Sequence, residues 1–213
     1  MLTIHFSDVS LFPDSPIRGS GRVSNAFLER GVSDLREAAL HVKRMPYWKN
    51  DDRHDVLSIL DEGHGTCVSK HDLIAALAQE NGVPVYRYEG VYLLDDAIVT
   101  GVSRLLEPYG LQDIPRTHCF LEHCGSHFDL TDGNCTGKNG LIHDYLRVEQ
   151  VERGDDDKVL LKLLGDLRKT DAPAGRLTDA EFLRILDECA EFNFGLCKCG
   201  PKPGQDRGEA ASA

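Results

Sequence analysis

A cysteine stands at the start of a predicted helix, in the stretch DEGHGTCVSKHDL. A thiol at a helix N-terminus meets unpaired backbone N–H groups and the positive end of the helix dipole, and both favour the thiolate form. Gly63 and Gly65 precede Cys67, so the backbone can turn sharply and leave N–H groups free to hold an oxyanion. Cys67 is therefore a candidate nucleophile, at a place suited to stabilising a tetrahedral intermediate.

A thiolate needs a base, and a predicted hairpin, RTHCFLEHCGSHFDLT, supplies one. We expect its two-residue loop at Cys124-Gly125, although cysteine is unusual at positive φ. That loop makes His118 and Asp129 diagonal neighbours on one face, about 7–8 Å apart at the backbone. Asp129 can then fix the tautomer of His118 and stabilise its cation. A loop changed by one residue would put the two side chains on opposite faces.

Predicted helices and strands surround these residues. Apolar periodicity and capping signals predict helices over about 33–45, where Pro46 ends the first, and over 55–62, 67–81, 157–169 and 178–192, with Ser33 as the first cap and a Thr178/Glu181 capping box. A short helix is expected near 101–110. Strands are expected over 2–9, 83–94 and 144–153, and residues 12–25 are expected to form a loop.

The order of these features resembles the transglutaminase-like superfamily, a branch of the papain-like thiol enzymes. The resemblance is carried by GTC at 65–67, GVP at 82–84, HCF at 118–120 and FDLT at 128–131, with two lead-in helices, and covers about residues 33–132. It implies an α+β, papain-like/transglutaminase-like core in which N-terminal helices and the nucleophile helix pack on an antiparallel sheet, with extra C-terminal helices.

The resemblance also implies roles and chemistry. Cys67 would be the nucleophile, His118 the general base and acid, and Asp129 the orienting carboxylate. The reaction would be acyl transfer from an amide through a thioester, to an amine or to water, with no cofactor and no metal. Hydrolysis is favoured because water is always present, whereas amine transfer requires a site that excludes it. The expected partner is a peptide or another amide-containing substrate.

The domain organisation that we expect has three parts. Residues 1–153 form the transglutaminase-like catalytic domain, and 154–199 form a C-terminal helical extension packed on it. We expect residues 200–213, whose sequence is GPKPGQDRGEAASA, to form a disordered tail.

Composition bounds the remaining possibilities. The chain has 213 residues, of which 41% are hydrophobic and 28% charged, as in globular proteins. Its net charge of -11 disfavours nucleic acids and anionic membrane surfaces. The N-terminal residues lack the features of a signal peptide, and no window is long enough to span a membrane, so we expect a cytoplasmic location. Seven cysteines, an odd number, favour reduced thiols. The oligomeric state stays open.

Several neighbouring residues have alternative interpretations. Asp132 competes with Asp129, although TDGN favours a turn for it. His71, four residues after Cys67, is a second base, a metal ligand or, more often in such a position, a residue bonded to backbone. An upstream oxyanion donor is not fixed, with Tyr47, Trp48 and Asn50 as candidates.

Two other classes of function remain open. One is a noncatalytic peptide-binding module on the same scaffold. The other is a metal or redox protein that uses the Cys/His cluster at 119–135. Its candidate zinc ligands would be Cys119, His123, Cys124 and His127, although their spacing matches no common zinc module. The CKC at 197–199 is a weak signal of the same kind.

Overall fold

The fold, a computed structural model that describes residues 1–19, 21–155 and 157–197, is α+β, as predicted. Within these ranges a four-stranded antiparallel sheet has the order β4-β3-β2-β6, and β1 pairs with β5. The strands are β1 (Leu2–Thr3), β2 (Tyr86–Leu94), β3 (Ile114–His123), β4 (Ser126–Phe128), β5 (Asp144–Tyr145) and β6 (Arg147–Gln150). The α-helices are α1 (Arg22–Glu29), α2 (Leu35–Arg44), α3 (Ser58–Glu62), α4 (Cys67–Glu80), α5 (Ser103–Leu106), α6 (Lys158–Leu167) and α7 (Asp179–Leu196).

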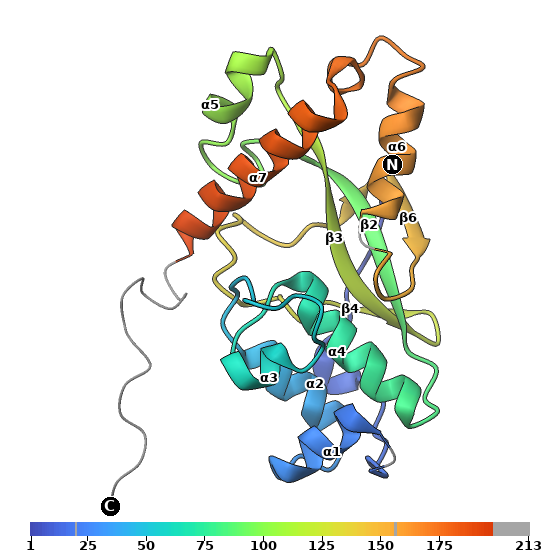
Figure 1. The fold of residues 1–213 in the computed structure, drawn as a ribbon. Coiled ribbons are helices and arrows are strands. Elements are labelled where there is room, and N and C mark those ends of the chain that lie inside the picture. The colour runs from blue at the N-terminus through green and yellow to red at the C-terminus, as the bar shows by residue number, and fades with distance from the viewer. Residues whose placement is uncertain (20, 156, 198–213) are drawn as a thin grey trace, which may run out of the picture.

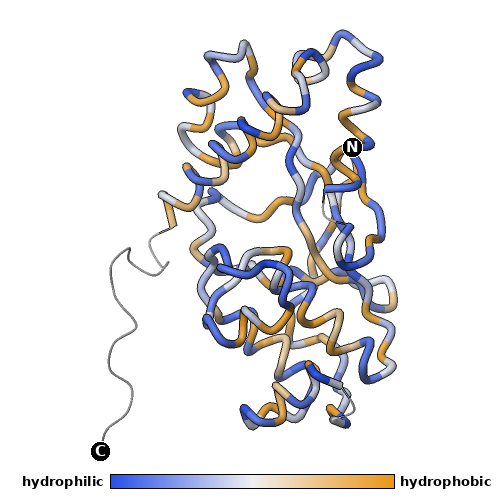
Figure 2. The backbone as a smooth tube through the Cα atoms, in the orientation of Figure 1, coloured by the Kyte–Doolittle hydropathy of each residue, from blue (hydrophilic) through white to orange (hydrophobic). Residues whose placement is uncertain are grey.

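The long β2–β3 ribbon joins two groups of helices: α1–α4 lie around one end of it and α5–α7 around the other (Figure 1). Each group has its own hydrophobic cluster. Neighbouring residues of β3 enter different clusters, Leu121 the one with α4 and Phe120 the one with α6 and α7. This follows from the alternation of side chains along a strand. Apolar and polar residues are interspersed along α6 and α7 (Figure 2), and the buried apolar residues of both helices belong to the cluster that also contains residues of β2 and β3.

Some boundaries differ from the prediction. The expected loop 12–25 contains the start of α1. The N-terminus of this helix is capped by hydrogen bonds to a residue that is far away in the sequence. Glu80, at the end of α4, accepts hydrogen bonds from the backbone N–H groups of Val23 (3.0 Å) and Ser24 (2.7 Å). Because the local N-cap is Gly21, which has no capping side chain, the sequence near α1 carried no start signal.

Other expectations are confirmed or corrected in detail. The cap of α2 is Asp34 rather than Ser33, since its carboxylate accepts from Arg36 N–H at 2.8 Å. The Thr178/Glu181 capping box is present at the start of α7. The strand expected over 2–9 is only Leu2–Thr3, and that over 144–153 is divided into β5 and β6. The tail predicted over 200–213 lies outside the described residues.

The two features that position the candidate residues formed as expected. The helix α4 begins at Cys67, and Gly82 follows its end at φ 68°. His123 faces Ser126, so Cys124 and Gly125 form a two-residue loop with φ values of 49° and 81°. Both φ values are positive, as hairpin turns of this length require. In the described part of the chain, no helix is long and apolar enough to cross a bilayer.

One edge of β3 is only partly covered, and this determines where the site lies. β2 pairs with β3 from Ile114 to Glu122, whereas β4 pairs with it only from Leu121 to His123. The stretch before Leu121 therefore has no strand on its second side within the described residues. The helix α4 packs against β3, and Cys67 at its start contacts Cys119 of that strand.

Directly across from His118, on β2, stands Gly90. A Cβ built at Gly90 would lie 2.4 Å from Cδ1 of the Tyr145 ring, and Tyr145 is fully buried. We expect Gly90→Ala to lower the free energy of unfolding by about 1–3 kcal/mol, because the ring cannot move without disturbing the core. Urea denaturation measures this change. Gly165→Ala, in α6 where a Cβ meets nothing, is the control and should cause no loss of stability; equal effects of the two substitutions would contradict the prediction.

Candidate active site

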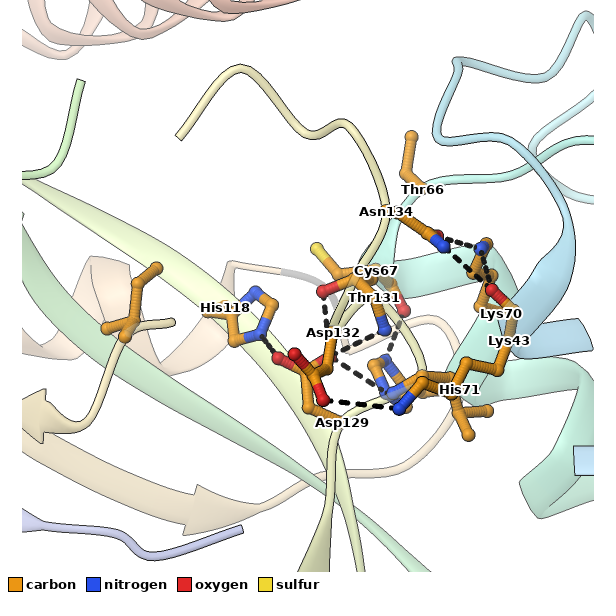
Figure 3. Close-up of polar contacts among 12 residues, drawn as sticks. Lys43, Thr66, Cys67, Lys70, His71, His118, Asp129, Thr131, Asp132 and Asn134 are labelled. Atoms are coloured by element: carbon orange, nitrogen blue, oxygen red, sulfur yellow. Dashed lines mark hydrogen bonds and ion pairs between the residues drawn. The ribbon is translucent and has the colours of Figure 1, made fainter. Parts of the chain in front are cut away.

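The fold brings the three predicted residues together from three elements. Cys67 begins α4, His118 lies on β3, and Asp129 follows β4 (Figure 3). His118 Nε2 and Asp129 Oδ2 are 2.8 Å apart, and both residues are buried. The hairpin register thus produced the pairing of imidazole and carboxylate that the sequence predicted.

The Asp129 carboxylate is held on both oxygens. Its Oδ1 accepts hydrogen bonds from the backbone N–H and the hydroxyl of Thr131, each at 2.7 Å. Burial acts to raise the pKa of Asp129, but His118, His71 and Thr131 outweigh it and hold the pKa well below its usual range. Asp129 is therefore a fixed negative charge under His118.

His118 presents its other nitrogen, Nδ1, toward the thiol. This atom is buried and has no hydrogen bond of ordinary geometry to a described group, but the ring is close enough to the Cys67 sulfur to interact with it. Burial would lower the pKa of His118, but the Asp129 carboxylate and the Cys67 sulfur raise it above the ordinary histidine value. The protonated imidazole is thus favoured, with Nδ1–H available to a partner in front of it.

The pKa of Cys67 moves in the opposite direction. A hydrogen bond from Cys119 lowers it most, burial opposes this, and His118 and Lys138 lower it further, so that it lies well below the usual thiol range. The matching shift of Cys119 is upward, because the hydrogen bond to Cys67 and burial keep its proton in place. The site therefore favours a thiolate at Cys67 beside an imidazolium at His118.

The sequence offers Cys119 as a zinc ligand or as a redox thiol, and it does not predict the contact with Cys67 that the structure shows. Alternation along β3 does send Cys119 and His118 to opposite faces. In the structure both nevertheless interact with Cys67. The only signal in the sequence is that Cys119 directly follows the candidate base His118, and this adjacency does not by itself predict a contact with Cys67.

His71 has the structural role that its position favoured. Its Nδ1 is 2.6 Å from the carbonyl of Cys67, and its Nε2 accepts the N–H of Leu130 at 2.8 Å. Burial lowers its pKa to about 4, so the ring is neutral near pH 7. His71 therefore ties the first turn of α4 to the segment that carries Asp129.

Asp132 is not the partner of His118. Its carboxylate lies 3.2 Å from Nζ of Lys43, an ion pair at the surface. Nearby, Lys70 is fully buried on α4 and donates to the carbonyls of Lys43 and Met45 and to the side chain of Asn134. Burial lowers the pKa of Lys70 to about 7. Sequence reasoning missed this lysine, whose only signal is a charge three residues after Cys67 on the same helix.

The three candidate oxyanion donors differ in their contacts. Tyr47 Oη lies 4.0 Å from the Cys67 sulfur. Asn50 is occupied, since its amide donates to the carbonyl of His64 at 2.8 Å and to Glu62. The Trp48 ring packs on Phe194, with centroids 5.3 Å apart. Tyr47 is the candidate in contact with the nucleophile.

The 119–135 cluster does not converge on one point. Cys119 is buried against Cys67, Cys124 is exposed in the hairpin turn, and His123 contacts the carbonyl of Pro84. Among the described residues, no group of three or more His, Cys, Asp or Glu side chains has an arrangement that could hold a metal ion. Cys67, Cys119, Cys124 and Cys189 are free thiols, and Cys199 of the CKC motif lies outside the described residues.

A cleft of about 440 Å³ opens in front of the thiol. Its walls come from Cys67 and its neighbours, from β3 and from α7, including Leu183, Leu186 and Phe194. A second hollow, of about 230 Å³, is lined by His118, Asp129 and the segment that follows. Lys138 lines both, so the sulfur and the imidazole face adjoining spaces.

These shifts predict the reactivity of Cys67. Iodoacetamide should alkylate it well below pH 8, since the thiolate is the reactive form and its pKa is lowered. His118→Ala should slow this reaction near pH 7 by raising the pKa of the thiol. Peptide mapping after timed labelling measures both rates, with the exposed Cys124 as internal reference. Labelling of Cys67 that is no faster than that of a model thiol would rule the ion pair out.

Comparison with protein-family models, with curated proteins and with solved structures found no match for this chain. What the chain does must therefore be inferred from the geometry of Cys67, His118 and Asp129.

Proposed function

We propose that this protein is a cysteine-dependent enzyme that acts on amide bonds of peptide or isopeptide type, through a thioester on Cys67. The observation that carries the proposal is the buried His118–Asp129 pair of 2.8 Å beside a thiol whose pKa is lowered. A nucleophile, a base and an orienting group, linked in this order, are the parts that acyl transfer requires. The packing of α4 on β3 also supports the papain-like core that the sequence suggested.

In the first step, the Cys67 thiolate attacks the carbonyl carbon and the carbonyl π electrons move to its oxygen. The backbone N–H of Cys67, in the first turn of α4, is placed to donate to that oxyanion, and so is the hydroxyl of Tyr47. Burial and the neighbouring Cys67 raise the pKa of Tyr47 well above its usual value, so its proton stays available for donation.

In the second step, the tetrahedral intermediate collapses and the C–N bond breaks. His118 gives the proton on Nδ1 to the departing amine, which leaves an acyl thioester and a neutral imidazole. In hydrolysis, Nδ1 then takes a proton from water as the water oxygen attacks the thioester. The acid leaves, and the thiolate and imidazolium are restored. Water is always present and needs no further binding site, which favours hydrolysis over transfer to an amine.

Substitution of the nucleophile tests the proposal. We expect Cys67→Ser to reduce hydrolysis of fluorogenic peptide amides by roughly 10⁴-fold or more, because a serine hydroxyl is not ionised by this site. Brief incubation of the unaltered protein with reactive esters should give an acyl adduct on Cys67, detected by intact-protein mass spectrometry. Cys124→Ser, at an exposed thiol, is the matched control and should keep full activity. If broad amide and ester libraries give no adduct, the chain is better explained as a noncatalytic binding module.

The pair of shifted pKa values predicts a bell-shaped pH profile for kcat/KM. Activity should rise as Cys67 loses its proton, on a limb below the ordinary thiol range, and fall as His118 loses its proton, on a limb above the ordinary histidine value. His118→Ala should abolish the bell. A single limb at the ordinary thiol pKa in the unaltered protein would contradict the ion pair as the active form.

Tyr47→Phe isolates the proposed oxyanion donor. Removing the hydroxyl should lower kcat by on the order of 10²-fold with little change in KM, since the oxyanion exists only in the transition state. Tyr109→Phe, which removes a hydroxyl bonded to Glu188 at 3.3–3.4 Å, is the control and should leave kcat unchanged. Equal kinetics for Tyr47→Phe and the unaltered protein would assign the oxyanion to backbone donors alone.

A further inference from the structure

Two buried hydrogen-bond donors near the thiol have no partner. They are Nη1 of Arg116 and the hydroxyl of Tyr92, neither of which bonds to any described group. The two residues are directly paired across β2 and β3, so their side chains share one face of the sheet. A buried donor left without a partner costs free energy, and natural proteins rarely keep two side by side. This pair therefore points to a group that arrives from outside.

The position of Arg116 indicates where such a group would bind, which is in the cleft beside Cys67. Arg116 is two residues before His118 on β3 and lines the same cleft as Cys67. Burial opposes its charge, but Tyr92, Tyr47, Cys67 and Cys189 act in the other direction and raise its pKa. Among the described residues, no carboxylate pairs with Arg116, whereas Lys49, in the same cleft, has Glu191 at 2.7 Å. The Arg116 guanidinium is thus positively charged, lines the cleft and has no carboxylate partner among the described residues.

A second cation lies close by. Lys138 lines the cleft, and its Nζ stands 5.6 Å from the centre of the Tyr92 ring. It also acts on the charge of Cys67. In a chain of net charge -11, Arg116 and Lys138 therefore place two positive charges in the part of the cleft beside the sulfur, while carboxylates line other parts of it. An anion that is repelled by the molecule as a whole is attracted at this point.

We propose that Arg116, with Tyr92, binds a carboxylate on the acyl side of the substrate, next to the carbonyl that Cys67 attacks. The proposal rests on the proposed function and narrows its substrates to amides whose acyl part carries a free carboxylate. A guanidinium presents N–H groups in a planar fork that matches the two oxygens of a carboxylate. The cleft is also lined by Glu89, Asp157, Asp187 and Glu191, so a doubly charged phosphate would meet more repulsion than a carboxylate.

Alkylation of Cys67 tests this selectivity without requiring turnover. Iodoacetate and iodoacetamide have the same leaving group and differ by a carboxylate, and each transfers its carbon to the thiolate as iodide departs. The ratio of their rates at Cys67 should exceed the ratio for a model thiol. We expect Arg116→Gln to lower that ratio by about tenfold or more, and Tyr92→Phe to lower it less. Arg104→Gln, on α5 and outside the cleft, is the matched control and should leave it unchanged.

Protection of the unaltered protein is the second measurement. Glutarate should slow labelling by iodoacetamide, and glutaramide should not. If Arg116→Gln does not fold, the proposal is tested by this protection of the unaltered protein and by the iodoacetate-to-iodoacetamide rate ratio of the charge-conserving Arg116→Lys variant. An iodoacetate ratio that is unchanged by Arg116→Gln, or equal protection by glutarate and glutaramide, would overturn the proposal. Stronger protection by inorganic phosphate than by glutarate would overturn the choice of a carboxylate. Because labelling needs only the thiolate, these outcomes stand even if no amide is hydrolysed.

If amides are hydrolysed, substrate pairs give a further readout. A glutaryl anilide should be cleaved with a higher kcat/KM than a pentanoyl anilide, and Arg116→Gln should bring the two values together. Cleavage of both at equal rates would overturn the carboxylate subsite while leaving the proposed function intact. Cleavage of neither, with the alkylation ratio as expected, would overturn the proposed function while leaving the subsite intact.

Discussion

The hydrogen bond between His118 Nε2 and Asp129 Oδ2 is the interaction on which the rest of the site depends. A buried carboxylate is costly unless its charge is compensated, and here an imidazolium and the two donors of Thr131 compensate it. The same bond leaves Nδ1 as the nitrogen that faces the thiol. It also makes the imidazolium stable enough for Cys67 to exist as its thiolate counterpart. The thiolate, the imidazolium and the carboxylate thus form a chain of three alternating charges, in which each charge is stabilised by its neighbour.

The geometry of this chain is secured by groups that take no part in the chemistry. His71 bonds the first turn of α4 to Leu130, one residue beyond Asp129. Lys70 bonds the same helix to the end of α2 and to Asn134. A lysine and a histidine in a helix core would normally be destabilising, and both have lowered pKa values. Their retention is explained if the distance between sulfur and imidazole is what they stabilise, because each joins α4 to the segment after β4.

The sequence predicted the parts of the site that depend on local rules. The start of α4 at Cys67 follows from the glycine-rich approach and the apolar stripe after it, and the register of His118 and Asp129 follows from a two-residue hairpin loop. Both are short-range properties. What it did not predict depends on contacts between distant segments. Glu80 accepts hydrogen bonds at the start of α1, and Cys119 of β3 contacts Cys67 of α4. Arg116 and Tyr92 became a pair through a strand register that no local pattern specified.

The C-terminal helix α7 illustrates the same limit and gives the site its shape. From the sequence it is an extension packed on the catalytic domain that could help to shape the pocket, without any residue of it being named. In the structure Phe194 of α7 stacks on Tyr47, with ring centroids 5.9 Å apart, and Glu191 pairs with Lys49 at 2.7 Å. Since Tyr47 touches the Cys67 sulfur, α7 holds in place a side chain that faces the nucleophile. The helix also shares a hydrophobic cluster with β2 and β3, so the strand that carries His118 and the wall opposite the thiol are fixed by one core. An active site here is thus not confined to residues 33–132, where its motifs lie, because the cleft that would select a substrate is closed by α7.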